Sequence, residues 1–414
     1  MHDATALLDT LATLPLAHCS GRPATGAYPD RLKPILSLAA HAEAMTEIAD
    51  WPGYAPTPLI ALPGLARAAG VGAIHYKQEA GRFGLGSFKA LGGAYAVLRL
   101  LKKEIARRSG QQASSRDLLE GRFRDIVGNI TVACATDGNH GRSVAWGAQM
   151  FGCQCVIYIH ATVSEGRRAA IARYGAEVVR TAGNYDDAVR AADAAAKENG
   201  WFIVSDTSYP GYTDVPRDVM QGYSVMVEEA LRQWPEAAPP THVFVQGGVG
   251  GFAAAVCAQM WERLGDARGR LVLVEPDKAA CLYASALAGA PTAVHGDLDT
   301  LMAGLACGEV SLIAWDVLEA GAADFLTVPD SSAVTCMRLL ADAPYGDTPV
   351  VAGESAVAGL AGMLMAAARP DTAAALGLGP DSRVLFFGSE GATDPALYEQ
   401  LVGRSAEAVE RGAA

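Results

Sequence analysis

The fold of this chain is decided by the stretch Gly84-Leu85-Gly86-Ser87-Phe88-Lys89-Ala90-Leu91-Gly92-Gly93. It follows a predicted strand at residues 73–77, and its second half opens a predicted amphipathic helix. Ser87 stands where the N-cap of that helix is expected. The helix is predicted because apolar side chains recur at helical spacing, at Phe88, Leu91, Tyr95, Leu98 and Leu101.

Lys89 occupies an unusual position for a lysine, the first turn of this predicted helix. The helix dipole is positive there, and the neighbouring glycines leave room for a ligand. Both features favour a neutral amine, which is the form that a Schiff base requires. Lys89 is therefore a candidate covalent residue, and a solvated helix lysine is the alternative that this stretch leaves open.

The composition is that of a globular protein, with 414 residues of which 50% are hydrophobic and 19% are charged. This length corresponds to about two or three domains. The net charge of −12 argues against binding to nucleic acid or to an anionic membrane, because both need clustered Lys and Arg. We expect no membrane segment, since no leader opens the chain and no apolar run could span a bilayer.

The eight cysteines lie in apolar segments without the spacing of a disulfide framework. Cys153 and Cys155 share one face of a predicted strand, and buried packing explains them better than a metal site. We therefore expect no metal and a soluble protein of the reducing cytoplasm.

Strands and helices alternate through most of the chain, which predicts parallel pairing, right-handed crossovers and an α/β architecture. Residues 1–55 are weakly patterned, and the polar residues 107–125 are expected to form a surface excursion. Strands are predicted at 130–134, 153–159, 177–180, 202–204, 242–246, 270–274 and 383–387, and helices at 141–151, 164–174, 185–198, 220–232 and 252–263.

A glycine cluster at residues 247–251 follows one of these strands and precedes a helix. Backbone N–H groups at such a helix N-terminus can bind a phosphate, and glycine lets the backbone approach it. Gly248-x-Gly250-x-x-Ala253 also approximates a dinucleotide fingerprint, with Glu275 where a ribose-binding acid would stand. A tight packing turn is the third interpretation, and the motif alone does not decide between them.

Three other loops follow predicted strands, where sites are found in α/β folds. Thr136-Asp137-Gly138-Asn139-His140-Gly141 could line a ligand, or could be an Asp-Gly turn with an Asn helix cap and a structural histidine. Asp206 places a carboxylate after the strand at 202–204, although surface acids are common. The Ser389 hydroxyl could donate a hydrogen bond to a ring nitrogen of a bound ligand, or Ser389 could begin a turn.

Four motifs resemble, in their order, the fold-type II pyridoxal phosphate enzymes: Ser87-Phe88-Lys89, Gly138-Asn139-His140, residues 247–251 and Ser389-Glu390-Gly391. More closely, the chain resembles the diaminopropionate ammonia-lyase family over about residues 55 to 395, and the combination is specific although each motif alone is not. The matching stretches are Arg82-Phe83-Gly84-Leu85, Phe88-Lys89, Leu91-Gly92-Gly93, Thr136-Asp137-Gly138-Asn139-His140-Gly141-Arg142, Met220-Gln221-Gly222-Tyr223, Val274-Glu275-Pro276 and the run from Met302 to Glu309.

The run from Met302 to Glu309 separates this family from the general serine and threonine dehydratases. Two positions depart from the family pattern. Gly86 replaces an expected asparagine, and Gly388-Ser389 replaces an expected Ser-Thr pair. The second departure falls on the expected partner of the ring nitrogen.

The resemblance implies a fold similar to the tryptophan synthase β chain, with two open twisted α/β domains and the cofactor, pyridoxal 5'-phosphate, in the cleft. A large domain of residues 1–91 and 201–414 would be interrupted by a small domain of residues 92–200. The resemblance also implies a homodimer.

The resemblance further implies the roles of the site residues. Lys89 would hold the cofactor, with Phe88 and Asn139 beside its ring. Ser389 would face the pyridine nitrogen as a neutral partner, which suits elimination better than transamination. The phosphate would be bound by the backbone of Gly247, Gly248, Val249, Gly250 and Gly251.

Two carboxylates, Asp137 and Asp206, are the predicted catalytic acids and bases beside Lys89. A 2,3-diaminopropionate carries a β-ammonium that a carboxylate would attract, and two carboxylates could each take the Cα proton of one enantiomer. The implied reaction is α,β-elimination of D- or L-2,3-diaminopropionate, through an aminoacrylate, to pyruvate and two ammonia. A serine, threonine or β-substituted-alanine dehydratase stays open as an alternative, and so does an NAD-dependent dehydrogenase.

Overall fold

The computed structural model describes residues 4–136 and 138–413. The chain groups into two compact units. The first unit is formed by the residues up to Pro34, Thr57–Gly81 and the residues from Met226 onward, and the second by Ile35–Pro56 and Arg82–Val225. The predicted small domain, residues 92–200, lies inside the second unit, which also includes residues 35–56, 82–91 and 201–225.

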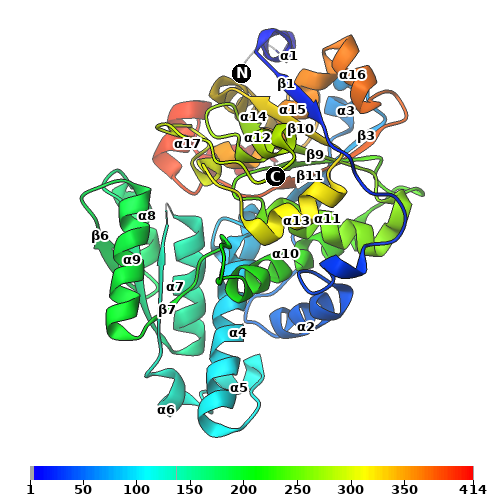
Figure 1. The fold of residues 1–414 in the computed structure, drawn as a ribbon. Helices are drawn as coiled ribbons and strands as arrows, with labels where there is room; N and C mark the ends of the chain where they lie inside the picture. Colours follow the sequence, from blue (N-terminus) through cyan, green and yellow to red (C-terminus); the bar gives the residue numbers. More distant parts are fainter. Residues whose placement is uncertain (1–3, 137, 414) are drawn as a thin grey trace. The chain divides into compact units, whose positions relative to one another are not determined.

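The first unit is built on a seven-stranded sheet (Figure 1). Its five central strands are parallel, and the strand at each edge is antiparallel to its neighbour. The order across the sheet is β1 (Ala17–Ser20), β10 (Asp324–Val328), β9 (Arg270–Pro276), β8 (His242–Gln246), β11 (Arg383–Gly388), β3 (Ala73–Gln78) and β2 (Leu59–Ala61). This sheet places the carboxyl ends of β8, β9 and β11 at one edge, where ligands bind in such folds.

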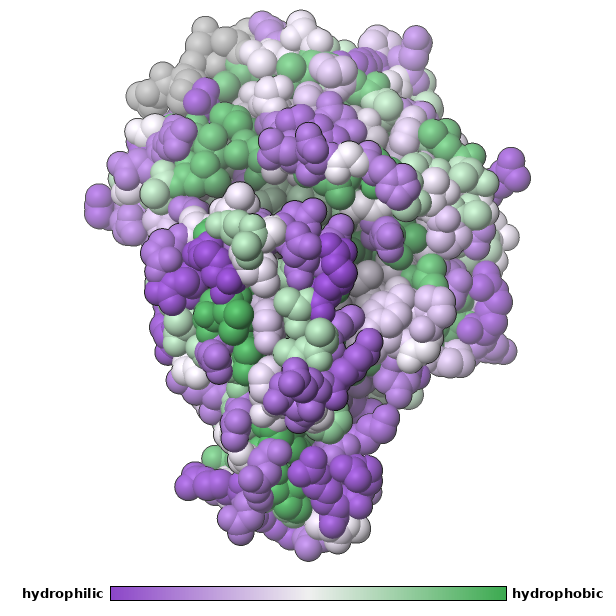
Figure 2. Space-filling view, turned by 60° about the vertical axis from the view of Figure 1, so that its left-hand side comes forward, coloured by the Kyte–Doolittle hydropathy of each residue, from purple (hydrophilic) through white to green (hydrophobic). Residues whose placement is uncertain are grey.

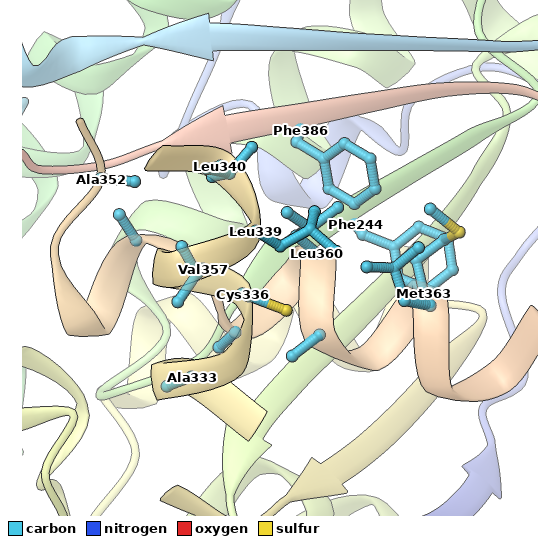
Figure 3. Close-up of a cluster of buried hydrophobic side chains, with 14 of the residues drawn as sticks. Phe244, Ala333, Cys336, Leu339, Leu340, Ala352, Val357, Leu360, Met363 and Phe386 are labelled. Atoms are coloured by element: carbon cyan, nitrogen blue, oxygen red, sulfur yellow. The ribbon is translucent and has the colours of Figure 1, made fainter. Parts of the chain in front are cut away.

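Helix α15 (Ala358–Ala367) covers the middle of this sheet with apolar side chains. Phe244 of β8 and Phe386 of β11 have ring centroids 5.9 Å apart, and Figure 3 shows Leu360 and Met363 of one helix near Phe244. All four side chains are buried, so this contact anchors the strands that lead into the predicted site. The helices of the first unit are α1 (Ala4–Thr13), α3 (Pro63–Ala69), α11 (Gly251–Leu264), α12 (Cys281–Ala288), α13 (Leu312–Gly321), α14 (Asp330–Asp342), α15 (Ala358–Ala367), α16 (Pro370–Leu376), α17 (Pro395–Val402) and α18 (Ala406–Ala413).

The second unit contains a four-stranded sheet in which every pairing is parallel. The strand order is β6 (Glu177–Arg180), β5 (Gln154–Ile159), β4 (Thr131–Ala135) and β7 (Phe202–Ile203). The α/β prediction is therefore confirmed. The helices of this unit are α2 (Leu38–Ala49), α4 (Lys89–Ser109), α5 (Ser115–Leu119), α6 (Arg124–Val127), α7 (Asn139–Phe151), α8 (Glu165–Ala172) and α9 (Tyr185–Asn199), and α10 (Asp214–Gln233) begins in it and ends in the first unit.

The predicted helix after the opening stretch is α4, which runs beside α7 (Figure 1). Glycines let the two helices come close, because a Cβ on Gly147 would lie 2.7 Å from Ala94 Cα and a Cβ on Gly93 would lie 2.2 Å from Ser143 Oγ. The predicted apolar face of α4 is confirmed as a buried face. It consists of Phe88, Leu91, Tyr95, Leu98 and Leu101.

One sequence prediction in this unit is wrong. Ser87 is not the N-cap of α4: Phe88 occupies that position, with helical angles and no side-chain cap. The buried Ser87 lies one residue before that N-cap. The predicted surface excursion at residues 107–125 is largely confirmed, since most of these residues are exposed. The segment also includes α5 and buries Leu118 and Phe123.

Hydrophilic side chains cover much of the face shown in Figure 2, with smaller apolar areas between them. Within residues 4–136 and 138–413, the helices are too short or too polar for any of them to span a bilayer.

Candidate active site

Helix α7 holds Lys89 at the start of α4. Ser143 Oγ donates a hydrogen bond to the carbonyl oxygen of Lys89 at 2.6 Å, and it accepts one from the N–H of Ala94 at 3.2 Å. Arg142 Nη1 donates to the carbonyl oxygen of Leu85 at 2.8 Å. The backbone on both sides of the lysine is thus fixed by buried polar groups, which restricts where its amine can reach.

Two aromatic rings, one from the N-cap residue of α4 and one from α10, lie beside the Lys89 amine. The Phe88 and Tyr223 rings have centroids 4.6 Å apart, and Lys89 Nζ lies 5.5 Å from the first and 5.8 Å from the second. This approach needs small residues, because a Cβ on Gly92 would lie 2.3 Å from Tyr223 Cε1 and one on Gly222 would lie 2.3 Å from the Leu91 carbonyl oxygen. The rings therefore form an apolar wall against which the amine is held.

Asp206 and Lys89, both in the second unit, form an ion pair. Lys89 Nζ lies 2.6 Å from Asp206 Oδ2, and the two side chains are only 21% and 17% exposed. Burial alone would raise the pKa of Asp206, but the Lys89 ammonium outweighs it and holds this pKa well below its usual range. Tyr212 fixes the loop by donating from its hydroxyl to the Ile203 carbonyl at 2.9 Å. Asp206 is therefore ionised at neutral pH.

His140 presents one ring nitrogen to Asp206. Its Nε2 lies 2.8 Å from the carbonyl oxygen of Val204, and because a carbonyl can only accept, Nε2 carries the hydrogen. Nδ1 lies 3.8 Å from Asp206 Oδ2 and, among the described residues, is buried without a hydrogen-bond partner. Burial, aided by Lys89, lowers the pKa of His140 in spite of the carboxylate. The ring is therefore neutral, with its Nδ1 lone pair directed toward Asp206.

The predicted loop after β4 leads directly into this cluster. Helix α7 begins at Asn139, and Thr136 Oγ1 accepts hydrogen bonds from the N–H groups of Gly138 and Gly141, each at 3.0 Å. The proposed Asn helix cap is therefore wrong, because the threonine hydroxyl caps the helix. The predicted catalytic Asp137 lies outside the described residues.

The glycine loop belongs to the first unit, between β8 and α11. Gly248 and Gly250 have φ angles of 87° and 96°, which favour glycine. Among the described residues, no acceptor takes the N–H groups of residues 248–251, while the carbonyl of Val249 accepts from Ser311 N at 2.8 Å. Four donors near a helix N-terminus are thus left for a ligand, and a phosphate fits them.

Glu275, the acid of the dinucleotide interpretation, has a structural role instead. Its carboxylate accepts hydrogen bonds from the N–H groups of Leu282 at 3.1 Å and Tyr283 at 2.7 Å, at the start of α12. The side chain packs against Gly247, where an added Cβ would lie 2.3 Å from Glu275 Cγ. Burial raises the pKa of Glu275 to about 8, against the pull of the two N–H groups. A buried, occupied carboxyl cannot bind a ribose.

The run from Met302 to Glu309 lies against the glycine loop. The carbonyl oxygen of Gly304 would be 3.5 Å from a Cβ on Gly248. The N–H of Gly304 donates to Ser355 Oγ at 3.0 Å, and the N–H of Ser355 donates to Glu390 Oε1 at 3.2 Å. The run is thus connected through Ser355 to the Ser389-Glu390-Gly391 tail, so three motifs distant in sequence form one cluster.

Both departures from the family pattern have structural reasons. Gly86 has a φ of 79°, in the left-handed region that glycine and asparagine tolerate best. Gly388 lies beside the buried Tyr76, and a Cβ at position 388 would lie 2.1–2.3 Å from three atoms of that side chain. Tyr76 therefore fills the space that a serine side chain at position 388 would need.

Replacing Gly388 by Ser is expected to destabilise the protein by about 1–3 kcal/mol, the usual cost of overpacking a core. The cost should shrink in a Tyr76→Leu background, since the two side chains compete for one space. Urea unfolding of the two single variants and the double variant measures this coupling. Gly379→Ser is the control, because nothing lies within 4 Å of a Cβ there. Equal costs in both backgrounds would contradict the explanation.

The residues present fit pyridoxal phosphate. The second unit supplies an amine beside aromatic rings and a carboxylate, and the first supplies free N–H donors and, at Ser389, a buried hydroxyl that accepts from Gln246 Nε2 at 2.6 Å. The structure brings Lys89, Phe88 and Asp206 together, and separately brings the glycine loop near Ser389. Residues that sequence reasoning missed are Gln246, a polar residue ending a buried strand, and Tyr223, Ser143 and Ser355.

Comparisons with known proteins agree with this chemistry. The family model described as "Pyridoxal-phosphate dependent enzyme" matches residues 51–389. A diaminopropionate ammonia-lyase of Escherichia coli K12 is 41% identical over 364 residues, which are 86% of this chain and 89% of the relative. The crystal structure of the holo diaminopropionate ammonia lyase from Escherichia coli superimposes with a TM-score of 0.85 at 37% identity, covering 94% of this chain and 97% of that one.

A second Escherichia coli structure of that enzyme, in complex with an aminoacrylate-PLP azomethine reaction intermediate, has a TM-score of 0.83 at 36% identity, and covers 94% of this chain and 97% of that one. The predicted resemblance, fold type and cofactor are thereby confirmed, and the NAD-dependent alternative is not supported. The chain belongs to the pyridoxal-phosphate-dependent enzymes of fold type II and, within them, to the diaminopropionate ammonia-lyase family.

Proposed function

We propose that this chain eliminates ammonia from 2,3-diaminopropionate, giving an aminoacrylate that water converts to pyruvate and a second ammonia. The proposal rests on the 2.6 Å ion pair of Lys89 with Asp206, in a chain 41% identical to a diaminopropionate ammonia-lyase. Diaminopropionate carries an ammonium on its β-carbon, and a mostly buried carboxylate attracts that charge. Serine and threonine carry a neutral hydroxyl there, so Asp206 favours the diamine.

We assign the cofactor contacts as follows. Lys89 binds the cofactor covalently, with Phe88 and Asn139 beside the ring, and Ser389 faces the pyridine nitrogen. When bound, pyridoxal phosphate supplies an electron sink for the charge that the substrate gains as its Cα proton leaves. The phosphate is assigned to the backbone N–H groups of Gly247, Gly248, Val249, Gly250 and Gly251, of which all but the first have no acceptor among the described residues.

The carboxylate of Asp206 holds the substrate and takes up a proton. Because its pKa is low, it is charged at neutral pH and can attract the β-ammonium. Once the Lys89 amine is engaged elsewhere, Asp206 loses its partner and becomes more basic, so that it can accept a proton from Cα. Asp137 is proposed as the second carboxylate, and each of the two would serve one enantiomer.

His140 is proposed to steady Asp206 during this step. Its Nε2–H is committed to the Val204 carbonyl, so the ring cannot turn without losing a buried hydrogen bond. The Nδ1 lone pair, 3.8 Å from Asp206 Oδ2, is then the nearby acceptor for a proton on that carboxyl.

The function is tested by measuring pyruvate and ammonia released from D- and L-2,3-diaminopropionate, serine and threonine by the cofactor-loaded enzyme. We expect kcat/KM for at least one diaminopropionate enantiomer to exceed that for serine and threonine by about 100-fold or more. A higher value for serine or threonine would instead support the dehydratase alternative. Absence of pyruvate from every substrate, with cofactor bound, would reject both.

We also propose that the enzyme acts as a homodimer in the cytoplasm, as its family resemblance implies. Light scattering after size-exclusion chromatography tests the assembly. A mass of one chain across the working concentration range would contradict it.

A further inference from the structure

Gln246, the last residue of β8, forms hydrogen bonds with two polar groups at the end of β11. The two strands are parallel neighbours, and both Gln246 and Ser389 are buried, at 2% and 4% exposure. Gln246 Nε2 lies 2.9 Å from the carbonyl oxygen of Phe387 and 2.6 Å from Ser389 Oγ. This one amide nitrogen therefore connects the strand before the glycine loop to the residue after β11.

The partners of this amide determine the direction of each hydrogen bond. The Phe387 carbonyl can only accept, so the atom facing it must be the amide nitrogen and not the amide oxygen. That nitrogen has two hydrogens, and the Phe387 carbonyl and the Ser389 hydroxyl take one each. Ser389 Oγ is therefore an acceptor from Gln246. Its own hydrogen is directed elsewhere, and no acceptor for it is found among the described residues.

We infer that Gln246 is a positioning residue that makes the Ser389 hydroxyl a hydrogen-bond donor toward the pyridine nitrogen of the cofactor. This inference rests on the proposed function, which assigns Ser389 to that nitrogen. A hydroxyl that donates needs a lone pair on the ring nitrogen, so it stabilises the unprotonated ring. An unprotonated ring stabilises less carbanion charge, which suits elimination of a good leaving group.

A carboxylate at position 246 would reverse this hydrogen bond. Carboxylate oxygens only accept, so the side chain introduced by Gln246→Glu would take the hydrogen of Ser389 and turn the hydroxyl lone pair toward the ring nitrogen. The ring nitrogen would then need a proton of its own. Gln246→Glu thus reverses the hydrogen bond with Ser389 and removes the one to the Phe387 carbonyl, at nearly constant side-chain size.

The test loads the full-length enzyme with pyridoxal phosphate labelled with ¹⁵N in the ring and records the ¹⁵N chemical shift of the bound cofactor. In the natural enzyme we expect the shift of an unprotonated pyridine nitrogen. In Gln246→Glu we expect a move toward the pyridinium shift, with kcat reduced roughly 10- to 100-fold, as for other outer partners of a site. Gln154→Glu, the same change on β5 of the second unit, should leave the shift unchanged.

A second variant distinguishes the proposed positioning role of Gln246 from a purely structural role. If Gln246 acts through the hydroxyl, Gln246→Glu should not move the shift when Ser389 is replaced by Ala, and should move it again with Ser389→Thr. A pyridinium shift in the natural enzyme would overturn the inference without any variant, as would an unchanged shift in cofactor-loaded Gln246→Glu. Loss of cofactor binding by the natural enzyme would instead reject the proposed function.

Discussion

Lys89→Ala is expected to lower kcat on 2,3-diaminopropionate at least about a thousandfold, the range seen when a covalent catalytic group is removed. The reason is chemical: the Lys89 amine lies 2.6 Å from the Asp206 carboxylate and beside the aromatic rings of Phe88 and Tyr223. Borohydride reduction followed by peptide mass spectrometry should place the cofactor adduct on Lys89 in the natural enzyme.

Two comparison variants make this result specific. Lys89→Arg keeps the charge beside Asp206 but cannot form the covalent link, so it should retain the fold and lose turnover. Lys103→Ala changes an exposed lysine of the same helix, 76% exposed and 3.3 Å from Asp214, and should leave kcat within about twofold because surface pairs contribute little. Turnover that survived in Lys89→Ala would reject the covalent role.

The fold was largely predictable because its central strands are buried on both faces. Such strands appear in sequence as continuous apolar runs, and the predicted 242–246 agrees with the fully buried β8 at both ends. The edge strand β1 was missed for the same physical reason. It has four residues, is half-exposed and includes His18 and Cys19, so it lacks both an apolar run and a clear alternation.

The candidate site was predictable residue by residue but not in its contacts. Lys89 is recognisable in the sequence from its place at the start of a helix, and Asp206 from its place after a strand. They are 117 residues apart, however, and no local pattern predicts that they pair. The place of Tyr76 beside Gly388 was equally invisible, because it depends on the neighbouring register of β3 and β11. Gln246 did leave a signal, since a polar residue ending a buried strand needs a partner.

Asp206→Asn is expected to lower kcat/KM for one enantiomer of 2,3-diaminopropionate by about 100- to 10,000-fold, the contribution of a general base, and to affect the other enantiomer much less. Asp137→Asn should show the opposite preference. Separate kinetics on pure D and L substrates measure this. Asp214→Asn removes the same charge from an exposed position of the second unit and should leave both enantiomers unaffected. Equal losses on both enantiomers in Asp206→Asn would reject the division of labour between the two carboxylates.

The effect of Asp206→Asn on thermal stability is expected to depend on pH in a definite direction. The pKa of Asp206 is lowered in the folded protein, so its ionisation stabilises the fold above the unfolded pKa, about 4, and this contribution is lost as the pH falls through the folded value. The difference in thermal stability between the natural enzyme and Asp206→Asn should therefore be larger at pH 7 than at pH 3. Lys89→Ala should abolish most of this pH dependence, because the ammonium at 2.6 Å holds the carboxylate in its charged form. A stability difference independent of pH would mean that the pair contributes by packing and not by charge.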